Sequence, residues 1–498
     1  MAAGRLGGQA ARRLGGQRTA TQWGAVTGIP ESWRRGEVAV VGLAKSGQAA
    51  VRLLRHHGFA VYASDTKESP DLLAAAERLR GEGCAVDLGR HDLPRIAGAS
   101  AMVLSPGVPP TAPPYLAAQN ADVPIVAELD LAARCLPGTR LVVTTGTKGK
   151  STTSALIARL LETTGMGPGE AAGNIGLPVS EVALREPAPA WLAVEASSFQ
   201  LHDAPALTPA VGVFTNLSPD HLDRYPGVDA YYADKALLFR NAVEDSRWVT
   251  NGDDPDVARL ARGRPGVHQR FSLDVRAADA WYDRAAGWLV LRGFPLMRRR
   301  DLQLLGDHNV LNALAAGLAL PREADRDAIA QALKAFRALP HRLEPVAEPG
   351  RVLWVNDSKA TTVSSARSAV EALDRPVVLL LGGKDKGGSF RELAPALRGA
   401  RAVIAYGDAG ERVAIELQGL VPLVREGHDF GAVLARARAI AQPGDAVLLA
   451  PACASFDMFA NAEDRGRQFR AFVESLRKGK EGKEGKEGRD TPDAWGGT

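Results

Sequence analysis

Along most of this chain, short apolar runs alternate with stretches in which apolar residues recur every three or four positions. The runs at residues 38–41 (VAVV) and 141–145 (LVVTT) are each followed by a glycine-containing turn and a helical pattern. From residue 351 onward, apolar runs and helical patterns alternate again. Strands that alternate with helices are typical of parallel sheets covered by helices. The pattern therefore predicts an α/β protein, and the change of pattern at Pro340 indicates a domain boundary there.

The turn at residues 144–152 (TTGTKGKST) has the composition of a phosphate-binding loop. Glycines let backbone N–H groups approach phosphate oxygens, and the start of the following helix adds positive potential. A lysine and a hydroxyl supply further charge and a Mg²⁺ ligand, and Lys150 with Ser151 or Thr152 fits these roles. The motif G-x-x-x-x-G-K-[ST] is incomplete, because Thr144 stands where its first glycine belongs. The spacing favours polyphosphate binding, with a purely structural glycine turn as the alternative.

The overall composition is that of an ordinary globular protein. The 498 residues are many for one hydrophobic core, and 45% hydrophobic with 24% charged residues is a usual balance. Without an apolar run of 18 residues or a secretory signal, we expect a cytoplasmic protein with no membrane insertion. The formal charge of +4 comes largely from the terminal segments, which argues against nucleic-acid binding. The cysteines form no C-x-x-C pair and are expected to be small buried hydrophobic side chains: Cys84, Cys135 and Cys453.

The two ends of the chain are predicted to lack a packed structure. Residues 1–35 are rich in Gly, Ala and Arg, contain no acidic residue before Glu31, and are expected to form a disordered extension. An Arg-rich, acid-poor start is also typical of organelle transit peptides, so this alternative stays open beside a simple extended start. Residues 479–498 contain three copies of Gly-Lys-Glu and are expected to form a disordered tail.

The first part of the chain predicts a βαβ unit with a ligand site at its first turn. The strand Val38–Val41 leads into GLAKSG (42–47), a helix and a second strand that ends at Asp65. Ala44 replaces the middle glycine of the dinucleotide fingerprint G-x-G-x-x-G, which disfavours a nicotinamide cofactor and makes another nucleotide the better candidate. A later strand ends in Ser105-Pro106-Gly107, where a ligand contact and a plain βα turn are equal alternatives.

Polar side chains follow two apolar runs after the phosphate loop. Glu195 ends the run WLAVE, and His221 follows the run VGVF. The carboxyl ends of parallel strands meet at one edge of a sheet, so we expect Glu195 and His221 on neighbouring strand ends beside the loop. Together they could hold Mg²⁺ against phosphate oxygens, although either residue alone is more often a surface or capping residue. On composition alone, Lys235 is a solvated lysine, and three residues are helix caps: His308, Asn309 and Asn312.

Polar clusters also follow the strands of the third region. As before, the carboxyl ends of parallel strands predict a ligand site. The clusters are Asn356-Asp357-Ser358-Lys359, the segment 382–387 with its two lysines, and Ser455 with Asp457.

Eight motifs occur in the order in which one known family has them. They are TGTKGKST, GNIGLP, EASSFQL, DHLDRY, GDHNVLNALAA, LPHRLE, NDSKAT and PACASFD. They lie in the stretch from about Val38 to Leu476, which resembles the Mur ligases, the ATP-dependent amide-forming enzymes of peptidoglycan precursor synthesis. Within that family the chain looks most like the enzymes that add D-glutamate to UDP-N-acetylmuramoyl-L-alanine.

The resemblance implies a three-domain α/β fold. A Rossmann-like domain at residues 36–138 would bind the UDP-sugar, and a central P-loop ATPase-type domain at 139–340 would bind ATP. A C-terminal Rossmann-like domain at 341–478 would close on ATP and bind D-glutamate. ATP would phosphorylate the L-alanine carboxylate, and the D-glutamate amine would attack the acyl phosphate to give the amide, ADP and phosphate. The implied enzyme uses Mg²⁺ and is expected to be a monomer.

The same resemblance assigns residues by their match to the family's motifs. The catalytic residues are Lys150, Glu195, His221 and Lys235. The Mg²⁺ ligands are Ser151, Glu195, His221 and Lys235, the last as a carbamate. The ATP contacts are Gly146, Thr147, Lys148, Gly149, Lys150, Ser151, Thr152, His308, Asn309, Asn312, Arg342, Asp357 and Lys359. The UDP-sugar contacts are Lys45, Ser46, Asp65, Thr66, Ser105, Pro106, Gly107 and Asn174. The D-glutamate contacts are Thr361, Lys386 and Ser455.

Three positions depart from the family's usual residues. Lys148 stands where the family usually has Asn, Leu311 interrupts a polar pair before Asn312, and Ala462 replaces an aromatic residue that often lines the glutamate pocket. The pocket wall is therefore expected to come from another residue. Two alternatives remain: a ligase of the same superfamily that adds L-glutamate or another amino acid, and a nucleotide-binding protein without catalysis, which the intact catalytic residues disfavour.

Overall fold

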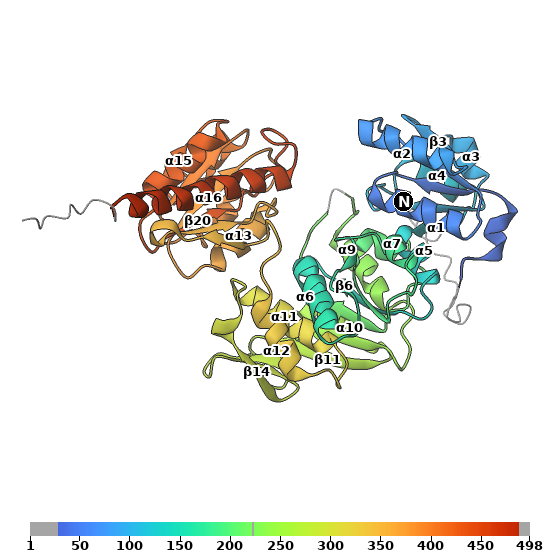
Figure 1. Cartoon of the computed structure of the whole chain (residues 1–498), viewed down its shortest axis with the longest axis horizontal. Coiled ribbons are helices and arrows are strands. Elements are labelled where there is room, and N and C mark those ends of the chain that lie inside the picture. Colours follow the sequence, from blue (N-terminus) through green and yellow to red (C-terminus); the bar gives the residue numbers. More distant parts are fainter. Residues whose placement is uncertain (1–27, 222–223, 488–498) are drawn as a thin grey trace, which may run out of the picture. The chain divides into compact units, whose positions relative to one another are not determined.

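The computed structural model describes residues 28–221 and 224–487, with side chains up to Arg477. Within these residues the chain forms three β-sheets (Figure 1). These residues divide into two compact units. The first unit contains the first sheet and most of the second, and the second unit contains the third sheet together with parts of residues 284–311.

The first sheet is fully parallel and has the strand order β3-β2-β1-β4-β5. Its strands are β1 (Val38–Val41), β2 (Val61–Asp65), β3 (Ala85–Leu88), β4 (Ala101–Leu104) and β5 (Ile125–Ala127). Its helices are α1 (Lys45–His56), α2 (Pro70–Gly81), α3 (Leu93–Ala97), α4 (Pro113–Asn120) and α5 (Glu128–Arg134). Strand β1 lies between β2 and β4, so the strand order reverses beside it: β2 and β3 lie on one side of β1, and β4 and β5 on the other. Open α/β sheets bind ligands outside the carboxyl ends of such strands.

The second sheet has nine strands in the order β14-β13-β12-β11-β10-β9-β6-β8-β7. They are β6 (Arg140–Thr145), β7 (Ala172–Gly173), β8 (Trp191–Glu195), β9 (Val211–Phe214), β10 (Arg247–Asn251), β11 (Val267–Ser272), β12 (Ala280–Asp283), β13 (Trp288–Leu291) and β14 (Phe294–Arg298). The associated helices are α6 (Lys150–Thr163), α7 (Val179–Ala183), α8 (Ser198–His202), α9 (Val228–Ala236), α10 (Pro255–Ala261), α11 (Asp307–Ala319) and α12 (Arg326–Ala335).

The strand order corrects one expectation. Glu195 and His221 were predicted on neighbouring strand ends, but β6 lies between β8 and β9 and pairs with both in parallel. The strand that leads into the phosphate loop therefore stands between the other two. Strand β7 and the strands β10 to β14 were not predicted.

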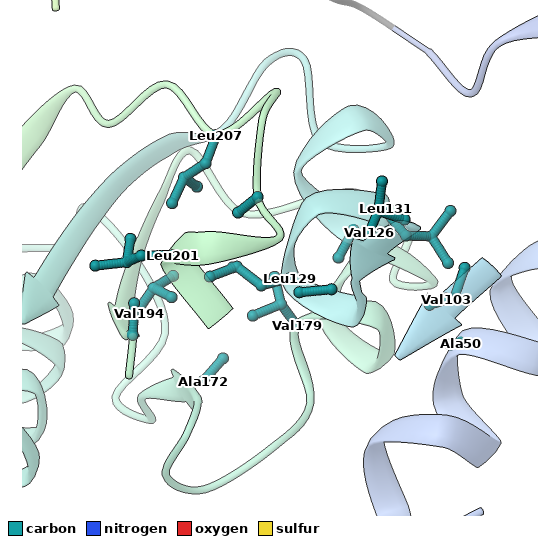
Figure 2. Close-up of a cluster of buried hydrophobic side chains, with 14 of the residues drawn as sticks. Ala50, Val103, Val126, Leu129, Leu131, Ala172, Val179, Val194, Leu201 and Leu207 are labelled. Carbon is teal, nitrogen blue, oxygen red and sulfur yellow. The ribbon is translucent and has the colours of Figure 1, made fainter. Parts of the chain in front are cut away.

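One hydrophobic core joins the first two sheets (Figure 2). Leu129 and Leu131 of helix α5 are fully buried in it, and the cluster extends from Val103 on β4 to Val179 on α7 and Val194 on β8. Because these apolar contacts are shared, the first sheet and most of the second form one compact unit.

The third sheet has the order β15-β16-β20-β17-β18-β19. Its strands are β15 (Glu344–Ala347), β16 (Leu353–Asn356), β17 (Val377–Gly382), β18 (Ala402–Tyr406), β19 (Leu423–Arg425) and β20 (Ala446–Leu449). The region was predicted to be parallel, yet β15 at its edge pairs antiparallel with β16. Helices α13 (Val363–Glu371) and α14 (Gly410–Leu417) pack on one face, and α15 (Phe430–Ile440) and α16 (Ala462–Glu487) on the other.

The predicted disordered ends are too long. Residues Glu31–Arg35 form a 3₁₀ helix in which Trp33 is buried, and α16 continues to Glu487. The remainder of these two predictions, residues 1–27 and 488–498, lies outside the described residues. Of the cysteines, Cys84 and Cys453 are buried as predicted and Cys135 is half-buried. No helix among the described residues is long and apolar enough to cross a membrane.

A single methyl group added on β9 should disturb the second sheet. An added Cβ at Gly212 would lie 2.5 Å from the fully buried ring of Trp248, which also donates to the carbonyl oxygen of Pro265 and cannot retreat freely. We expect Gly212→Ala to lower the free energy of unfolding by about 1–3 kcal/mol, as overpacking does. Urea unfolding followed by tryptophan fluorescence measures this. Gly138→Ala is the control, because a Cβ there has nothing within 4 Å; equal effects of the two substitutions would contradict the prediction.

Candidate active site

Two glycines shape the loop between β6 and α6. Gly146 has φ +140°, and a Cβ there would lie 2.0 Å from the hydroxyl oxygen of Thr215. Gly149 has φ +81° and directly precedes α6, and its Cβ would lie 2.5 Å from Oδ1 of Asn312. Only glycine fits both the backbone angles and the space. The loop can therefore present its N–H groups at the start of a long helix, as phosphate-binding loops do.

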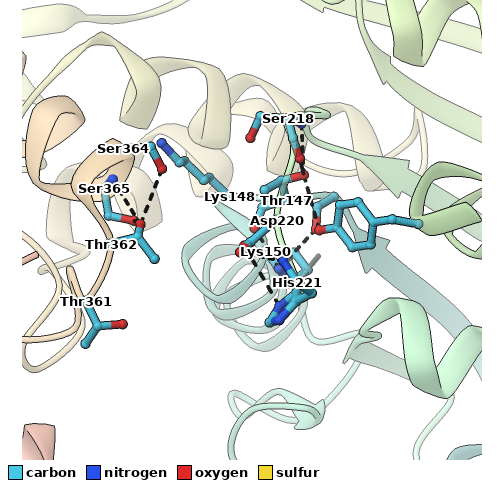
Figure 3. Close-up of polar contacts among 12 residues, drawn as sticks. Thr147, Lys148, Lys150, Ser218, Asp220, His221, Thr361, Thr362, Ser364 and Ser365 are labelled. Atoms are coloured by element: carbon cyan, nitrogen blue, oxygen red, sulfur yellow. Dashed lines mark hydrogen bonds and ion pairs between the residues drawn. The ribbon is translucent and has the colours of Figure 1, made fainter. Parts of the chain in front are cut away.

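Hydrogen bonds tie Thr147 of the loop to the segment after β9 (Figure 3). The Thr147 hydroxyl donates to the carbonyl oxygen of Ser218 at 3.1 Å and accepts from the Ser218 N–H at 3.0 Å. The Tyr231 hydroxyl lies 3.3 Å from the same Thr147 oxygen. These contacts fix the middle of the loop from helix α9 and from the end of the neighbouring strand.

The backbone of Lys148 is held on both sides. Its N–H donates to Oδ1 of Asn216 at 2.9 Å, and its carbonyl oxygen accepts from Thr215 Oγ1 at 2.7 Å and Asn216 Nδ2 at 3.0 Å. The position of residue 148 is thus set by Thr215 and Asn216.

Two lysines converge on one carbonyl oxygen of the loop. Lys150 Nζ donates to the carbonyl oxygens of Gly146 at 3.0 Å and Thr147 at 2.9 Å. Lys235 Nζ donates to the same Gly146 oxygen at 2.7 Å and lies 4.6 Å from the centre of the Tyr231 ring. Lys235 is only 1% exposed, so the interpretation as a solvated lysine is wrong. Burial holds the pKa of Lys235 well below its ordinary value, and the charge of Lys150 lowers it further.

A buried carboxylate with a free oxygen stands at the end of β8. Glu195 is 2% exposed, and its Oε1 accepts from Asn174 Nδ2 at 2.9 Å. Its Oε2 is buried and has no partner among the described residues. A buried carboxylate oxygen without a donor is costly, and a hard cation such as Mg²⁺ would satisfy it. Ser151 offers a second oxygen ligand, its hydroxyl. It is buried at the start of α6, the helix that follows β6, and β6 pairs with β8.

The other predicted metal ligand, His221, is in a different environment. Its side chain is 49% exposed, its backbone has φ +53°, and its ring packs against Phe199 with 5.4 Å between centres. Asp220 Oδ2 lies 3.9 Å from its Nε2. Figure 3 draws His221 and Lys150 in the same view of the loop region.

The predicted UDP-sugar contacts of the first sheet lie at one edge. Ser105, after β4, donates to the carbonyl oxygen of Gly42 at 3.0 Å, and Asp65, at the end of β2, accepts from the Leu43 N–H at 2.7 Å. The exposed residues Lys45, at the start of α1, and Thr66, after β2, share this edge with Ser46, Pro106 and Gly107. Asn174 lies elsewhere, on the second sheet against Glu195.

Of the predicted ATP contacts outside the loop, Asn312 lies against it. Its Oδ1 accepts from Thr153 Oγ1 of α6 at 3.1 Å. His308 and Asn309 fall in the second unit, where Asn309 is buried and its Nδ2 donates to the carbonyl oxygen of Leu305 at 2.8 Å. Arg342 is exposed in that unit.

Two further predicted ATP contacts follow β16. Burial raises the pKa of Asp357 to about 6, although the charge of Arg342 acts in the opposite direction. Lys359 forms an ion pair with Glu463 of α16. Asp357 is therefore a carboxylate whose charged form would gain from a nearby cation.

The predicted D-glutamate contacts gather around β17 and β20. Lys386 Nζ donates to Thr361 Oγ1 at 3.1 Å. Lys384 and Ala454 exchange two backbone hydrogen bonds of 2.9 Å, which places the loop after β17 beside the loop that carries buried Ser455. An ammonium group and hydroxyls at such strand ends are suitable donors for a carboxylate.

Sequence reasoning missed Arg465, which links the loops around these residues. Its side chain is fully buried on α16 and donates from Nε to Ser358 Oγ at 3.0 Å. Its terminal nitrogens donate to the carbonyl oxygens of Ser358, Cys453 and Ala454 at 2.9–3.4 Å. One arginine thus holds the loop after β16 to the loop after β20. The motifs NDSKAT and PACASFD did not indicate a buried arginine partner, because Arg465 contacts mainly their backbone carbonyls and not their side chains.

Three family sequence models match the chain. The Mur ligase MurD-like N-terminal domain matches residues 36–127, the Mur ligase middle domain 144–320, and the Mur ligase glutamate ligase domain 341–453. These matches follow the three sheets in order.

Relatives match over almost the whole chain. The protein named UDP-N-acetylmuramoylalanine--D-glutamate ligase of Acidobacterium capsulatum is 38% identical over 460 residues, which is 89% of this chain and 96% of the relative. The protein of that name from Salinibacter ruber is 39% identical and covers 90% of this chain and 99% of its own. Among solved structures, UDP-N-acetylmuramate-alanine ligase MurC of Thermotoga maritima matches with TM-score 0.56 and 19% identity over 88% of this chain and 99% of its own, a likeness of fold.

The buried Arg465 should be essential to the second unit. In Arg465→Met, the backbone carbonyls of Ser358 and Cys453 lose their donor, whereas that of Ala454 keeps the N–H of Lys384. A buried acceptor without a donor costs about 1–3 kcal/mol. We expect the free energy of unfolding to fall by about 3 kcal/mol or more, measured by urea unfolding with circular dichroism. Arg467→Met is the matched control, since Arg467 is an exposed arginine on the same helix. A variant of Arg465 as stable as that control would refute the role.

Proposed function

The chain belongs to the Mur ligase family, and we propose that it is an ATP-dependent ligase that adds D-glutamate to UDP-N-acetylmuramoyl-L-alanine in peptidoglycan precursor synthesis. The observation that carries this proposal is the identity of 38–39%, over about nine-tenths of the chain, with relatives of that name. The loop with its converging lysines supports the ATP-dependent half of the reaction.

The chemistry proceeds through phosphoryl transfer. The L-alanine carboxylate attacks the γ-phosphorus of ATP, which releases ADP and forms an acyl phosphate. The D-glutamate amine then attacks the acyl carbon, and the tetrahedral intermediate expels phosphate to leave the amide. Charge neutralisation and alignment supply most of the acceleration in such transfers. Lys150 would provide that charge at the start of α6, together with loop N–H groups other than those of Thr147 and Lys148, which donate to Asn216.

Mg²⁺ is proposed as a cofactor because the donors present suit it. Glu195, through its unpaired Oε2, together with Ser151, His221 and a modified Lys235, would hold the ion. When bound, Mg²⁺ neutralises phosphate charge and orients the phosphates.

Lys235 is suited to become a carbamate. In that reaction the neutral amine attacks the carbon of CO₂ and loses one proton, which leaves a carboxylate on Nζ. A lysine of ordinary pKa is protonated at neutral pH, but burial and Lys150 favour the neutral form of Lys235. The carbamate would place an anion that can bind a metal beside the charge of Lys150.

The remaining assignments keep their predicted partners. Residues 36–138 would bind the UDP-sugar through the edge of β1, β2 and β4, with Asn174 supplied by the next domain. Residues 139–340 would bind ATP, and residues 341–478 would bind D-glutamate through Thr361, Lys386 and Ser455. Both nucleotide substrates belong to the cytoplasm, where we place the reaction, and a monomer remains the prediction.

The substrate assignment is tested by ADP release. We expect purified protein with ATP, Mg²⁺ and UDP-N-acetylmuramoyl-L-alanine to release ADP with D-glutamate, and at most slowly with L-glutamate or no amino acid. Release only with L-glutamate would show that the acceptor is L-glutamate. No release with any acceptor would refute the proposed ligase activity.

Lys150→Ala should lower kcat/KM by about 100-fold or more, because one donor to the transferring phosphoryl group is lost. Lys334→Ala, an exposed lysine, is the control.

Lys235 is tested by chemical rescue. We expect Lys235→Ala to lose most turnover, and added formate or acetate to restore part of it by supplying the missing carboxylate in the space left by the side chain. The same additives given to the unmodified protein control for general salt effects. Full activity of Lys235→Ala without additive would count against the carbamate.

A further inference from the structure

Three potential metal ligands gather in the second unit, outside the site described above. Asp408 follows β18, His428 follows β19, and Asp457 lies in the loop after β20. One ligand atom from each residue lies within 4.8 Å of those of the other two. His428 Nε2 and Asp408 Oδ1 are 3.0 Å apart. All three residues stand at the carboxyl ends of parallel strands, where α/β sheets place ligands.

Backbone contacts hold two of the three loops together. The Asp408 N–H donates to Asp457 Oδ2 at 3.2 Å. Gly407 has φ +65°, and a Cβ there would lie 2.5 Å from the same Asp457 oxygen. Gly407 thus lets the carboxylate approach the turn closely. The approach of Asp457 to Asp408 is therefore built into the turn.

The cluster differs from an ordinary surface His–Asp pair. His202 and Asp234 form such a pair at 2.8 Å, and the Tyr225 hydroxyl donates to the second Asp234 oxygen at 2.9 Å. The pair of Asp408 and His428 has a different neighbour: a second carboxylate, that of Asp457, and not a hydroxyl donor like Tyr225. The Oδ1 of Asp457 is buried and has no partner among the described residues. Two carboxylates that share a site repel each other, and a cation bound by both removes that repulsion.

We propose that Asp408, His428 and Asp457 bind a divalent transition metal of the Zn²⁺ class. An imidazole with two carboxylates suits Zn²⁺, whereas Mg²⁺ prefers oxygen ligands alone. Three protein ligands also leave a fourth position for water, the usual arrangement of an open zinc site. A tetrahedral Zn²⁺ with ligands at about 2.1 Å spaces them about 3.4 Å apart. The side chains of His428 and Asp408 are 59% and 58% exposed and can rotate by the small amount required.

The bound metal would act on the loop after β20. Asp457 lies two residues after Ser455, and a metal that joins Asp457 to the ends of β18 and β19 would restrict the movement of this loop. The metal site itself depends only on the three ligands and stands whether or not the protein is a ligase.

Metal binding is tested with Zn²⁺ alone on the full chain, stripped with a chelator and free of nucleotide. Equilibrium dialysis should find one more Zn²⁺ on the unmodified protein than on His428→Ala, or at least tenfold weaker binding of that ion in the variant. Asp408→Asn, an exposed substitution of the same shape, should give the same loss. His268→Ala is the matched control, because His268 is an exposed histidine whose ring contacts a backbone carbonyl.

Co²⁺ gives an independent readout. The unmodified protein and His268→Ala should give the visible absorption of four-coordinate Co²⁺, and His428→Ala should lose that component while its circular dichroism stays unchanged. Equal Zn²⁺ stoichiometry and affinity in all four proteins would overturn the proposal. Displacement of the His428-dependent Zn²⁺ by an equal concentration of Mg²⁺ would overturn the choice of metal.

Discussion

The shared contact of Lys150 and Lys235 with the carbonyl oxygen of Gly146 is the constraint on which the site depends. Two ammonium groups on one acceptor repel each other, and one of them is buried. The folded protein reduces this conflict by favouring the neutral form of Lys235. A polyphosphate would satisfy Lys150, and an acidic group on Lys235 would turn the repulsion into attraction. The two converging ammonium groups thus destabilise the loop when it is empty, and the proposed anion and metal would relieve that repulsion.

The loop keeps its shape through backbone contacts, and this accounts for its unusual sequence. Gly146 is needed because the loop passes so close to Thr215, whereas the residue at position 144 belongs to β6 and pairs with β8 and β9. A glycine at 144 would add nothing to the turn. Lys148 in place of Asn is accommodated for a similar reason, since Thr215 and Asn216 hold its main-chain N–H and carbonyl whatever the side chain is.

Sequence patterns predicted which residues stand at strand ends, because apolar runs and turns are local features. They did not predict the order β9-β6-β8, because contacts between segments that are distant in the sequence decide which strands become neighbours. The burial of Lys235 was hidden for the same reason: helix α9 has polar and apolar residues on several sides, and only the position of the loop decides which side is covered. The family resemblance drew attention to Lys235 without that information, because it rests on matched motifs and not on the composition of the helix. Arg465 escaped both approaches, as it contacts backbone atoms that any sequence would supply.

The loop after β20 is held at two points, and Ser455, the proposed D-glutamate contact, lies between them. Arg465 binds the carbonyl oxygens of Cys453 and Ala454, while Asp457 accepts the N–H of Asp408. Ser455 stands between these points and is 2% exposed, so its hydroxyl has little freedom to move. A binding residue on a loop is precise only when the loop is supported by rigid elements. Here Arg465 of α16 supports one side of the loop, and Asp408 in the turn after β18 supports the other. Both residues lie outside the motif PACASFD that contains Ser455, so this motif alone did not reveal what holds Ser455 in position.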